Sequence, residues 1–298
     1  MSLEELLLGP RLIEALQSLF SPEFDWIFIV ITTLGSEEAL VGLSAVVYWC
    51  FDKLRGRWIM YTLLVGAYLN CFLKFIIPMP RPPVELRIVE KSETSLGFPS
   101  GHAQNSATFW ASLSLSFRGR ILAVTGTVVV LMIGVSRVYL GVHYPAQAIG
   151  GWIIGLAIAA VGMFVLRRLP SQNRRARLVS QTLFIVAMLA SVAAAVSIDP
   201  DGGVIAGRIA GFLLGFSLGA LVEERFVDFS VDISMMHKIL RAVVGGAVIG
   251  VLVLAIGPVL PDSHVVSGFA NSAIRGLFVV LIVPLIFRGI GRRWTLEK

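Results

Sequence analysis

The sequence of 298 residues is poor in charge. Asp, Glu, Lys and Arg make up only 15% of it, whereas a soluble domain carries about 25%. Hydrophobic residues account for 56%, and the mean hydropathy is +0.83. This composition excludes disordered, fibrous and disulfide-framework proteins. The apolar residues form long blocks, each able to cross a bilayer as a helix of about 20 residues. The composition therefore predicts an all-α, polytopic integral membrane protein.

Cysteine is also scarce. Cys50 and Cys71 lie in apolar stretches far from any CxxC spacing, which argues against disulfide and metal roles. His, Cys, Asp and Glu show no metal-ligand spacing, so we expect no metal and no other cofactor. The acidic segment Met1–Glu5 stands where a cleavable signal peptide needs basic residues. Residues 1–20 instead have apolar residues at helical spacing, which predicts an interfacial amphipathic helix.

The formal net charge of +6 comes from basic clusters in loops without interleaved aromatic residues, so we expect no nucleic-acid partner. One orientation places every basic cluster in the cytoplasm, as the positive-inside rule requires. In that orientation both termini are cytoplasmic, and the protein lies in the cytoplasmic (plasma) membrane. Hydropathy predicts ten spans, at about residues 22–34, 38–52, 58–77, 101–117, 120–137, 144–166, 178–197, 203–222, 239–260 and 267–287. The first two are short, and a single re-entrant pair is the alternative for them.

The basic stretch 167–177 divides the chain. It is predicted to be a cytoplasmic linker between a six-helix core at 21–166 and a four-helix membrane extension of unknown role at 178–298. Within the extension, glycine recurs every four residues from Gly203 to Gly219. Small residues at this spacing let helices approach closely in lipid. We expect this glycine face to pack within the chain, with a homodimer as the alternative.

The candidate catalytic and phosphate-binding residues concentrate on the predicted outer side. Lys74 lies in the last turn of a span, and Pro78 and Pro80 then force the chain into an extended conformation up to Arg81. The two cations can thus converge on one anion. An isolated lysine near a helix end more commonly extends to the membrane interface without further function.

The segment Pro99-Ser100-Gly101-His102 begins the next predicted span. Proline and serine are typical of a helix start, and the free N–H groups and the dipole of a first turn attract anions. The alternative is a capped helix with an interfacial histidine.

Further along, Arg137 ends one span and His143 immediately precedes the next. Together with Lys74 and Arg81, Arg137 can hold the non-bridging oxygens of a phosphate. One imidazole can attack phosphorus while the other protonates the leaving oxygen. These residues predict metal-independent phosphoryl transfer through a phosphohistidine on the extracytoplasmic side, with cations replacing the metal ions used elsewhere.

These three segments resemble the type 2 phosphatidic acid phosphatase superfamily, which also includes glucose-6-phosphatases and vanadium haloperoxidases. The signature of that superfamily is KxxxxxxRP, PSGH and SRxxxxxH, in this order. The resemblance spans residues 22–166 and leaves 178–298 outside it. It implies a six-helix core with the motifs at its outer face. The implied roles are His143 as nucleophile, His102 as general acid, Lys74, Arg81 and Arg137 as phosphate ligands, and Ser100 and Gly101 as further donors.

One position departs from that family pattern. Gln147 stands where the family usually has an aspartate, four residues after His143. Its amide oxygen can accept the imidazole N–H and fix the tautomer, but it cannot stabilise an imidazolium ion by charge. Loss of a carboxylate partner slows other histidine-dependent enzymes by orders of magnitude. The glucose-6-phosphatase branch is similar in carrying glutamine here, so we expect an active site.

The leading hypothesis is a membrane phosphatase whose substrate is a phospholipid or polyprenyl phosphate. Candidate substrates are a polyprenyl diphosphate, phosphatidic acid and phosphatidylglycerol phosphate. A lipid phosphotransferase, a sugar-phosphate phosphatase of the glucose-6-phosphatase type, a lipid or phosphate transporter and an inactive homologue remain alternatives. Arg208 and Arg275 lie inside predicted spans, where they can contact anionic headgroups or simply extend to the interface.

Overall fold

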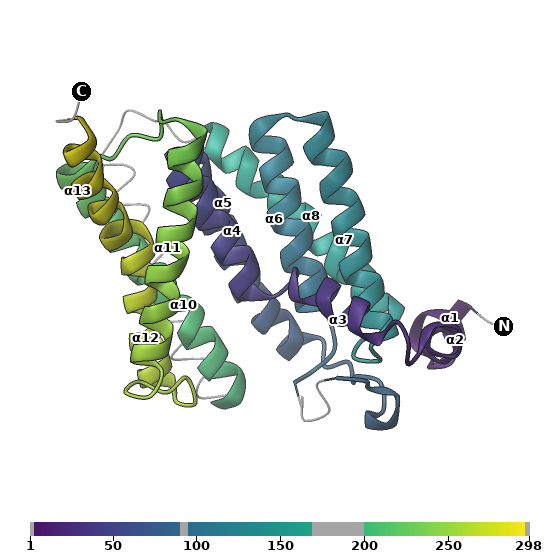
Figure 1. The fold of residues 1–298 in the computed structure, drawn as a ribbon. Helices are drawn as coiled ribbons and strands as arrows, with labels where there is room; N and C mark the ends of the chain where they lie inside the picture. The colour runs from purple at the N-terminus through teal and green to yellow at the C-terminus, as the bar shows by residue number, and fades with distance from the viewer. Residues whose placement is uncertain (1–2, 90–94, 169–199, 296–298) are drawn as a thin grey trace. The chain divides into compact units, whose positions relative to one another are not determined.

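The computed structural model describes residues 3–89, 95–168 and 200–295, whose regular structure is helical throughout (Figure 1). The chain forms two compact units, Met1–Leu43 with Trp58–Arg168, and Ser44–Arg57 with Leu169–Lys298. In the described part, six helices are long and apolar enough to cross a membrane, and one bent pair makes a further candidate span. The predicted all-α, polytopic architecture is therefore confirmed.

Four long helices build the first unit. Three shorter ones precede them: α1 (Leu3–Leu8), α2 (Arg11–Phe20) and α3 (Asp25–Thr33). α4 (Glu37–Cys50) leads into the second unit. The long helices are α5 (Lys53–Ile76), α6 (Gly101–Phe117), α7 (Arg120–Tyr139) and α8 (Pro145–Arg168), with a short 3-10 helix, η1 (Val84–Leu86), in the loop after α5. These bounds agree closely with the predicted spans, and the span predicted at 178–197 lies outside the described residues.

Glycines and buried amides hold α5, α6 and α8 together near one end. A Cβ at Gly155 of α8 would lie only 2.4 Å from the carbonyl oxygen of Gln104 on α6, so the two backbones touch. The Gln104 side chain donates to the Gly66 carbonyl of α5 at 2.7 Å, and Asn70 Nδ2 donates to Gln104 Oε1 at 3.0 Å. Because buried amides need partners, these bonds fix the end of α5 relative to the start of α6.

The N-terminal helices lie at this same end of the first unit. Ile13 of α2 is fully buried against the first turns of α6 and α8 and the last turn of α7. Gln17 Nε2 donates to the carbonyls of Leu86 and Tyr139, both at 2.8 Å. The segment predicted as one interfacial helix over 1–20 is thus two helices in the described residues, and they pack against the core.

The placement of α2 and α3 differs from the topology predicted for the N terminus. α3 has only nine residues, or about 14 Å at 1.5 Å per residue, against a hydrocarbon core of about 30 Å. α3 and α4 form a pair bent by 48°, and together they have the composition of a single span. The segments predicted at 22–34 and 38–52 thus form one bent helix pair, which is either a broken span or a re-entrant pair. α2 packs at the end of the first unit where the reactive residues lie, whereas the sequence predicted the N terminus on the opposite side.

Among its described residues, 44–57 and 200–295, the second unit contains three helical passes. They are α10 (Pro200–Val222) continued by the π-helix η2 (Glu223–Val227), α11 (Met235–Ile256), and α12 (Val265–Leu277) continued by the π-helix η3 (Phe278–Ile282) and α13 (Val283–Thr295). α10 and α12 run parallel with their backbones in contact. A Cβ at Gly211 would lie 2.1 Å from the Phe269 carbonyl oxygen, and one at Gly215 would lie 1.8 Å from that of Ala273. The glycine face thus packs within the chain, as expected, and a homodimer stays a prediction.

Residues 44–57 belong to this second unit because their side chains bond to it. Trp49 Nε1 donates to the Val279 carbonyl of η3 at 2.8 Å. Lys53 Nζ contacts the fully buried carboxylate of Glu223 at 2.8 Å. A π-helix frees backbone carbonyls from their ordinary partners, and the indole of Trp49 takes up one of them. These contacts join segments about 170 residues or more apart in the sequence.

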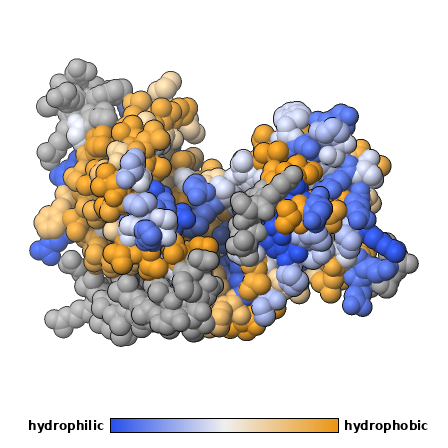
Figure 2. Space-filling model, turned by 90° about the horizontal axis from the view of Figure 1, so that it is seen from below, coloured by the Kyte–Doolittle hydropathy of each residue, from blue (hydrophilic) through white to orange (hydrophobic). Residues whose placement is uncertain are grey.

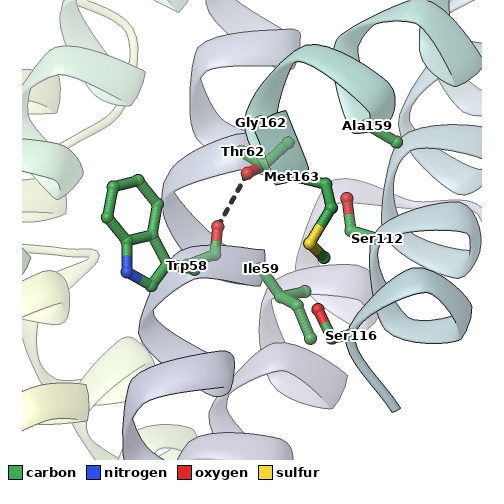
Figure 3. Close-up of a pocket in the computed structure, with 8 residues that line it drawn as sticks. All are labelled: Trp58, Ile59, Thr62, Ser112, Ser116, Ala159, Gly162 and Met163. Carbon is green, nitrogen blue, oxygen red and sulfur yellow. Dashed lines mark hydrogen bonds between the residues drawn. The ribbon is translucent and has the colours of Figure 1, made fainter. Parts of the chain in front are cut away.

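Figure 2 shows the molecule from below. Hydrophilic residues gather there on the first unit, at the end where α5 ends and α6 begins, and the surface of the second unit is largely hydrophobic. A small crevice in the first unit lies among α5, α6 and α8, at the ends of these helices remote from Lys74 and Gln147 (Figure 3). Uncharged side chains line this crevice, so it cannot supply the cations that a phosphate site needs. Its residues are Trp58, Ile59, Thr62, Ser112, Ser116, Ala159, Gly162 and Met163.

Candidate active site

Lys74 and Arg81 converge on Ser95 in the first unit. Lys74 lies in the last turn of α5, and its Nζ donates to Ser95 Oγ at 3.1 Å. Arg81 Nη2 donates to the same oxygen at 3.0 Å, and Arg81 Nε donates to the Ser95 carbonyl at 2.8 Å. Two cations thus meet at one hydroxyl oxygen, as they would at an oxygen of a phosphate. Sequence reasoning missed Ser95, because a lone serine in a loop carries no signal.

The start of α6 provides the second segment. Ser100 is the N-cap residue, and Gly101 and His102 form the first turn, as predicted. Ser100 is fully buried, and its Oγ has no hydrogen-bond partner within the described residues. Its backbone N–H donates to the Gln147 carbonyl at 3.0 Å. The His102 ring lies against Gly35, where a Cβ would be 3.4 Å from His102 Cδ2.

Arg137 comes from the last turn of α7 and is 98% buried, with only 2% of its surface exposed. Its Nη1 donates to Thr32 Oγ1 of α3 at 3.0 Å. The break between α3 and α4 therefore contributes to the site, since Thr32 holds Arg137. Gly35 lets the break pack against α7, because a Cβ there would lie 2.6 Å from Ile133 Cγ2. Neither residue was singled out from the sequence, because their roles depend on where the bent helix pair lies.

A tight turn carries the chain from Arg137 to His143. The Arg137 carbonyl accepts the N–H groups of Val142 and His143 at 3.2 and 3.3 Å. Gly141 has a φ of +70°, and a Cβ there would lie 1.9 Å from the Leu86 carbonyl oxygen. Only glycine satisfies both the positive φ and this approach. The turn thereby fixes where the imidazole of His143 lies.

The His143 tautomer follows from its neighbours. Nδ1 lies 3.0 Å from Gln147 Oε1, which also accepts the backbone N–H of Tyr144 at 3.2 Å. Gln147 Nε2 donates to the Pro80 carbonyl at 2.7 Å, which identifies the other amide atom as oxygen. Nδ1 must then carry the proton, and Nε2 presents its lone pair. Arg81 Nη1 lies 3.3 Å from Nε2, so a cation stands beside this lone pair.

Gln147 joins the three motif segments. Through its side chain and carbonyl it bonds to Pro80, to His143 and to the backbone of Ser100. Gly97 packs directly on the amide, and a Cβ there would lie 2.4 Å from Gln147 Nε2. Orientation of the imidazole was predicted for Gln147, but the bonds to Pro80 and Ser100 were not.

The electrostatics of the site keep His143 neutral. Burial lowers the pKa of His143 well below its ordinary value of 6.5, and Arg81, Arg137 and Lys74 lower it further. The hydrogen bond to Gln147 opposes this shift. An unprotonated imidazole is the form required of a nucleophile. In the part of the chain that the structure describes, no group of three or more His, Cys, Asp or Glu side chains could hold a metal ion.

Comparison with known proteins identifies this arrangement. The PAP2 superfamily matches residues 55–171, and the PAP2 superfamily phosphatase transmembrane extension matches residues 207–293. These matches, together with the long apolar helices, define a membrane-embedded phosphatase. The chain belongs to the PAP2 superfamily, and its second unit carries the transmembrane extension of that superfamily. The expectation that residues 178–298 lie outside the resemblance is thereby corrected for 207–293.

Similar proteins include phosphatidylglycerophosphatase B of Bacillus subtilis, 29% identical over 150 residues, which are 46% of this chain and 72% of that protein. The undecaprenyl-diphosphatase of Sulfolobus acidocaldarius is 26% identical over 136 residues, covering 43% of this chain and 64% of the relative. Glucose-6-phosphatase 3 of Mus musculus is 26% identical over 191 residues, covering 55% of this chain and 54% of that protein. The chain thus spans about two thirds of the length of the undecaprenyl-diphosphatase and about half of the length of glucose-6-phosphatase 3.

A crystal structure of a transmembrane PAP2-type phosphatidylglycerolphosphate phosphatase from Bacillus subtilis aligns with a TM-score of 0.49 and 24% identity, covering 55% of this chain and 87% of that one.

Proposed function

We propose that this protein hydrolyses a phosphomonoester or diphosphate of a lipid through a phosphohistidine at His143, without a metal ion. The observation that carries the proposal is the pinned imidazole. Gln147 Oε1 accepts a hydrogen bond from His143 Nδ1–H, so the Nε2 lone pair faces Arg81, where a phosphate would be held. A positioned nucleophile beside fixed cations is the arrangement that stabilises a phosphoryl-transfer transition state.

In the first step, His143 Nε2 attacks phosphorus, and an N–P bond forms as the bond to the leaving oxygen breaks. His102 donates a proton to that oxygen, so the leaving group departs as an alcohol or as a protonated phosphate. Lys74, Arg81 and Arg137 hold the non-bridging oxygens, with Ser100 and Gly101 as further donors. In the second step, water attacks phosphorus, His102 takes its proton, and the N–P bond breaks to release inorganic phosphate.

The substrate class follows from where the site lies. The reactive residues stand at the ends of membrane helices, which is the depth of a lipid headgroup. Two of the similar proteins are named for phosphatidylglycerophosphate and undecaprenyl diphosphate. We therefore favour a polyprenyl diphosphate, phosphatidic acid or phosphatidylglycerol phosphate. Transfer of the phosphate to an alcohol other than water would use the same residues.

A second candidate is a sugar phosphate. Gln147 is the observation that favours it, since the glucose-6-phosphatase branch carries glutamine at this position, and a glucose-6-phosphatase is among the similar proteins. An amide that orients the imidazole does not itself recognise the hydroxyl groups of a sugar, so this candidate ranks second.

We place the site on the extracytoplasmic face of the plasma membrane. The opposite end of the first unit carries Arg118 and Arg120 between α6 and α7 and Arg167 and Arg168 at the end of α8. Basic residues remain cytoplasmic under the positive-inside rule. The reactive end, with the N-terminal helices, is then outside.

Phosphate release by the purified protein tests the proposal. Wild type, His143→Ala and the remote control His237→Ala would be compared on a polyprenyl diphosphate, phosphatidic acid, phosphatidylglycerol phosphate and glucose 6-phosphate, with EDTA present. Release that is lost in His143→Ala and kept in His237→Ala supports the enzyme, and the preferred substrate decides between lipid and sugar. A requirement for added divalent metal would contradict the mechanism.

A further inference from the structure

Two arginines of the second unit converge inside its membrane spans. Arg208 lies in α10 and Arg275 in α12, both within stretches that have the composition of a membrane span. Their Nη2 atoms lie 4.0 and 3.4 Å from the same atom, Asp262 Oδ2. Charged groups in such stretches are costly and commonly mark a functional site. The two side chains therefore share one carboxylate and do not extend separately to the interface.

The loop between α11 and α12 is folded back to bring Asp262 there. Asn271 Nδ2 donates to the Leu260 carbonyl at 2.8 Å and to Asp262 Oδ1 at 3.1 Å. A Cβ at Gly268 would lie 3.0 Å from Arg208 Cγ and 3.4 Å from the Asp262 carbonyl oxygen. The glycine thus makes room for both groups. Because Asn271 holds the carboxylate, Asp262 is not free to move closer to Arg208.

The cluster has more donors than acceptors. Two guanidinium groups and one carboxylate leave a net charge of +1. Within the described residues Arg208 donates no hydrogen bond, and the buried Arg208 Nε, Arg275 Nε and Asn271 Oδ1 have no partner. Unpaired charge and unsatisfied donors are destabilising at low dielectric. The Arg208 and Arg275 side chains are still 32% and 18% exposed, so an anion can reach them.

We propose that Arg208 and Arg275 form a second, non-catalytic binding site for a phosphate group, with Asp262 as the internal anion that occupies it in part. The planar guanidinium fork matches the oxygens of a phosphate, and two forks can hold one group from both sides. The phosphate is that of an anionic lipid headgroup or a free phosphate ion. The site lies wholly within the second unit and does not depend on turnover at His143.

Lipid counting by native mass spectrometry tests this site. The full-length protein, delipidated in detergent, would be titrated with phosphatidylglycerol, a phosphodiester that carries no phosphomonoester to release. Arg208→Gln and Arg275→Gln should each lower the affinity for one bound lipid by about tenfold or more, because each variant loses a charge-assisted hydrogen bond. Asp262→Asn should raise the affinity for that lipid, because the substitution removes the competing carboxylate. Arg225→Gln, an exposed arginine at the other end of this pass, should change nothing.

Competition with inorganic phosphate identifies the source of the ligand. Displacement of the lipid at millimolar phosphate means that the site accepts the free ion. If phosphate does not displace the lipid, the site recognises a headgroup in the membrane. Unchanged lipid binding in both arginine variants overturns the proposal. So does weaker binding in a folded Asp262→Asn variant, which would make the cluster a structural ion triad. Phosphate release from the same preparations keeps the two proposals apart, because a failure at His143 leaves lipid counting unaffected.

Discussion

Replacement of Gln147 by aspartate restores the residue usual in the family, yet we expect it to lower activity. Gln147 Oε1 accepts from His143 Nδ1 at 3.0 Å, while Nε2 donates to the Pro80 carbonyl at 2.7 Å. A carboxylate can replace the first interaction but has no proton for the second. One carboxylate oxygen would then face a carbonyl oxygen, and the segment that leads to Arg81 would lose its link to α8.

The size of the effect follows from that single bond. An intramolecular hydrogen bond contributes about 0.5–1.5 kcal/mol, and leaving a buried acceptor without a donor costs about 1–3 kcal/mol. If this loss falls mainly on the transition state, where Arg81 must be aligned, a cost of about 1–3 kcal/mol corresponds to a rate reduced by about 5- to 150-fold. The charge that aspartate offers to the imidazolium acts in the opposite direction, so the lower part of this range is the expectation.

The assay is phosphate release by wild type, Gln147→Asp and Gln147→Glu, together with thermal unfolding of each. Glutamate keeps the length of glutamine and changes only the amide, so it isolates the lost donor. Both variants should fold and both should be slower than wild type. A Gln147→Asp protein that matches or exceeds the wild-type rate would refute the reasoning and show that the bond to Pro80 is dispensable.

Three further predictions concern the packing at Gly97, the pKa of His143 and the contact between α10 and α12. Gly97→Ala should slow phosphate release by about tenfold or more, because the new methyl overlaps the Gln147 amide at 2.4 Å; a wild-type rate would contradict this packing. Because the pKa of His143 is lowered in the folded state, the unfolded chain binds more protons there below about pH 6.5, so wild type should lose thermal stability relative to His143→Ala on acidification from about pH 7 to 5. Parallel pH dependences of the two proteins would argue against a neutral His143. Gly215→Val should lower the unfolding temperature of the second unit, since its side chain would meet the Ala273 carbonyl, 1.8 Å from Cβ; an unchanged melting profile would mean that α10 and α12 do not touch there.

The long helices were predictable from the sequence because apolar blocks with clear ends specify them. Pro99 and Ser100 mark the start of α6, and Arg118 and Arg120 mark the turn between α6 and α7. The spacing of the motifs then brings their residues to one end of the bundle, since α5 ends and α6 begins there. At α3 and α4 hydropathy left two interpretations, two spans or one re-entrant pair, because neither short apolar block is long enough to cross the membrane alone.

Other features depend on contacts between distant segments, which no local pattern encodes. Ser95 meets Lys74 and Arg81 only because the loop after α5 folds back over them. The roles of Thr32 and Gly35 appear once the bent helix pair is placed against α6 and α7. The membership of residues 44–57 in the second unit likewise rests on the bonds of Trp49 and Lys53 to distant carbonyl and carboxylate groups.

The most direct test of the central claim is to trap the phosphohistidine. His102→Ala would be mixed with a lipid phosphate that carries a radiolabelled phosphorus, in EDTA, quenched after a short time, and the labelled residue would be located by peptide mass spectrometry. The account predicts label on His143 that approaches one per chain and is absent from His143→Ala. Rapid release by wild type without label on His143 in the His102 variant, or label on another residue, would contradict it.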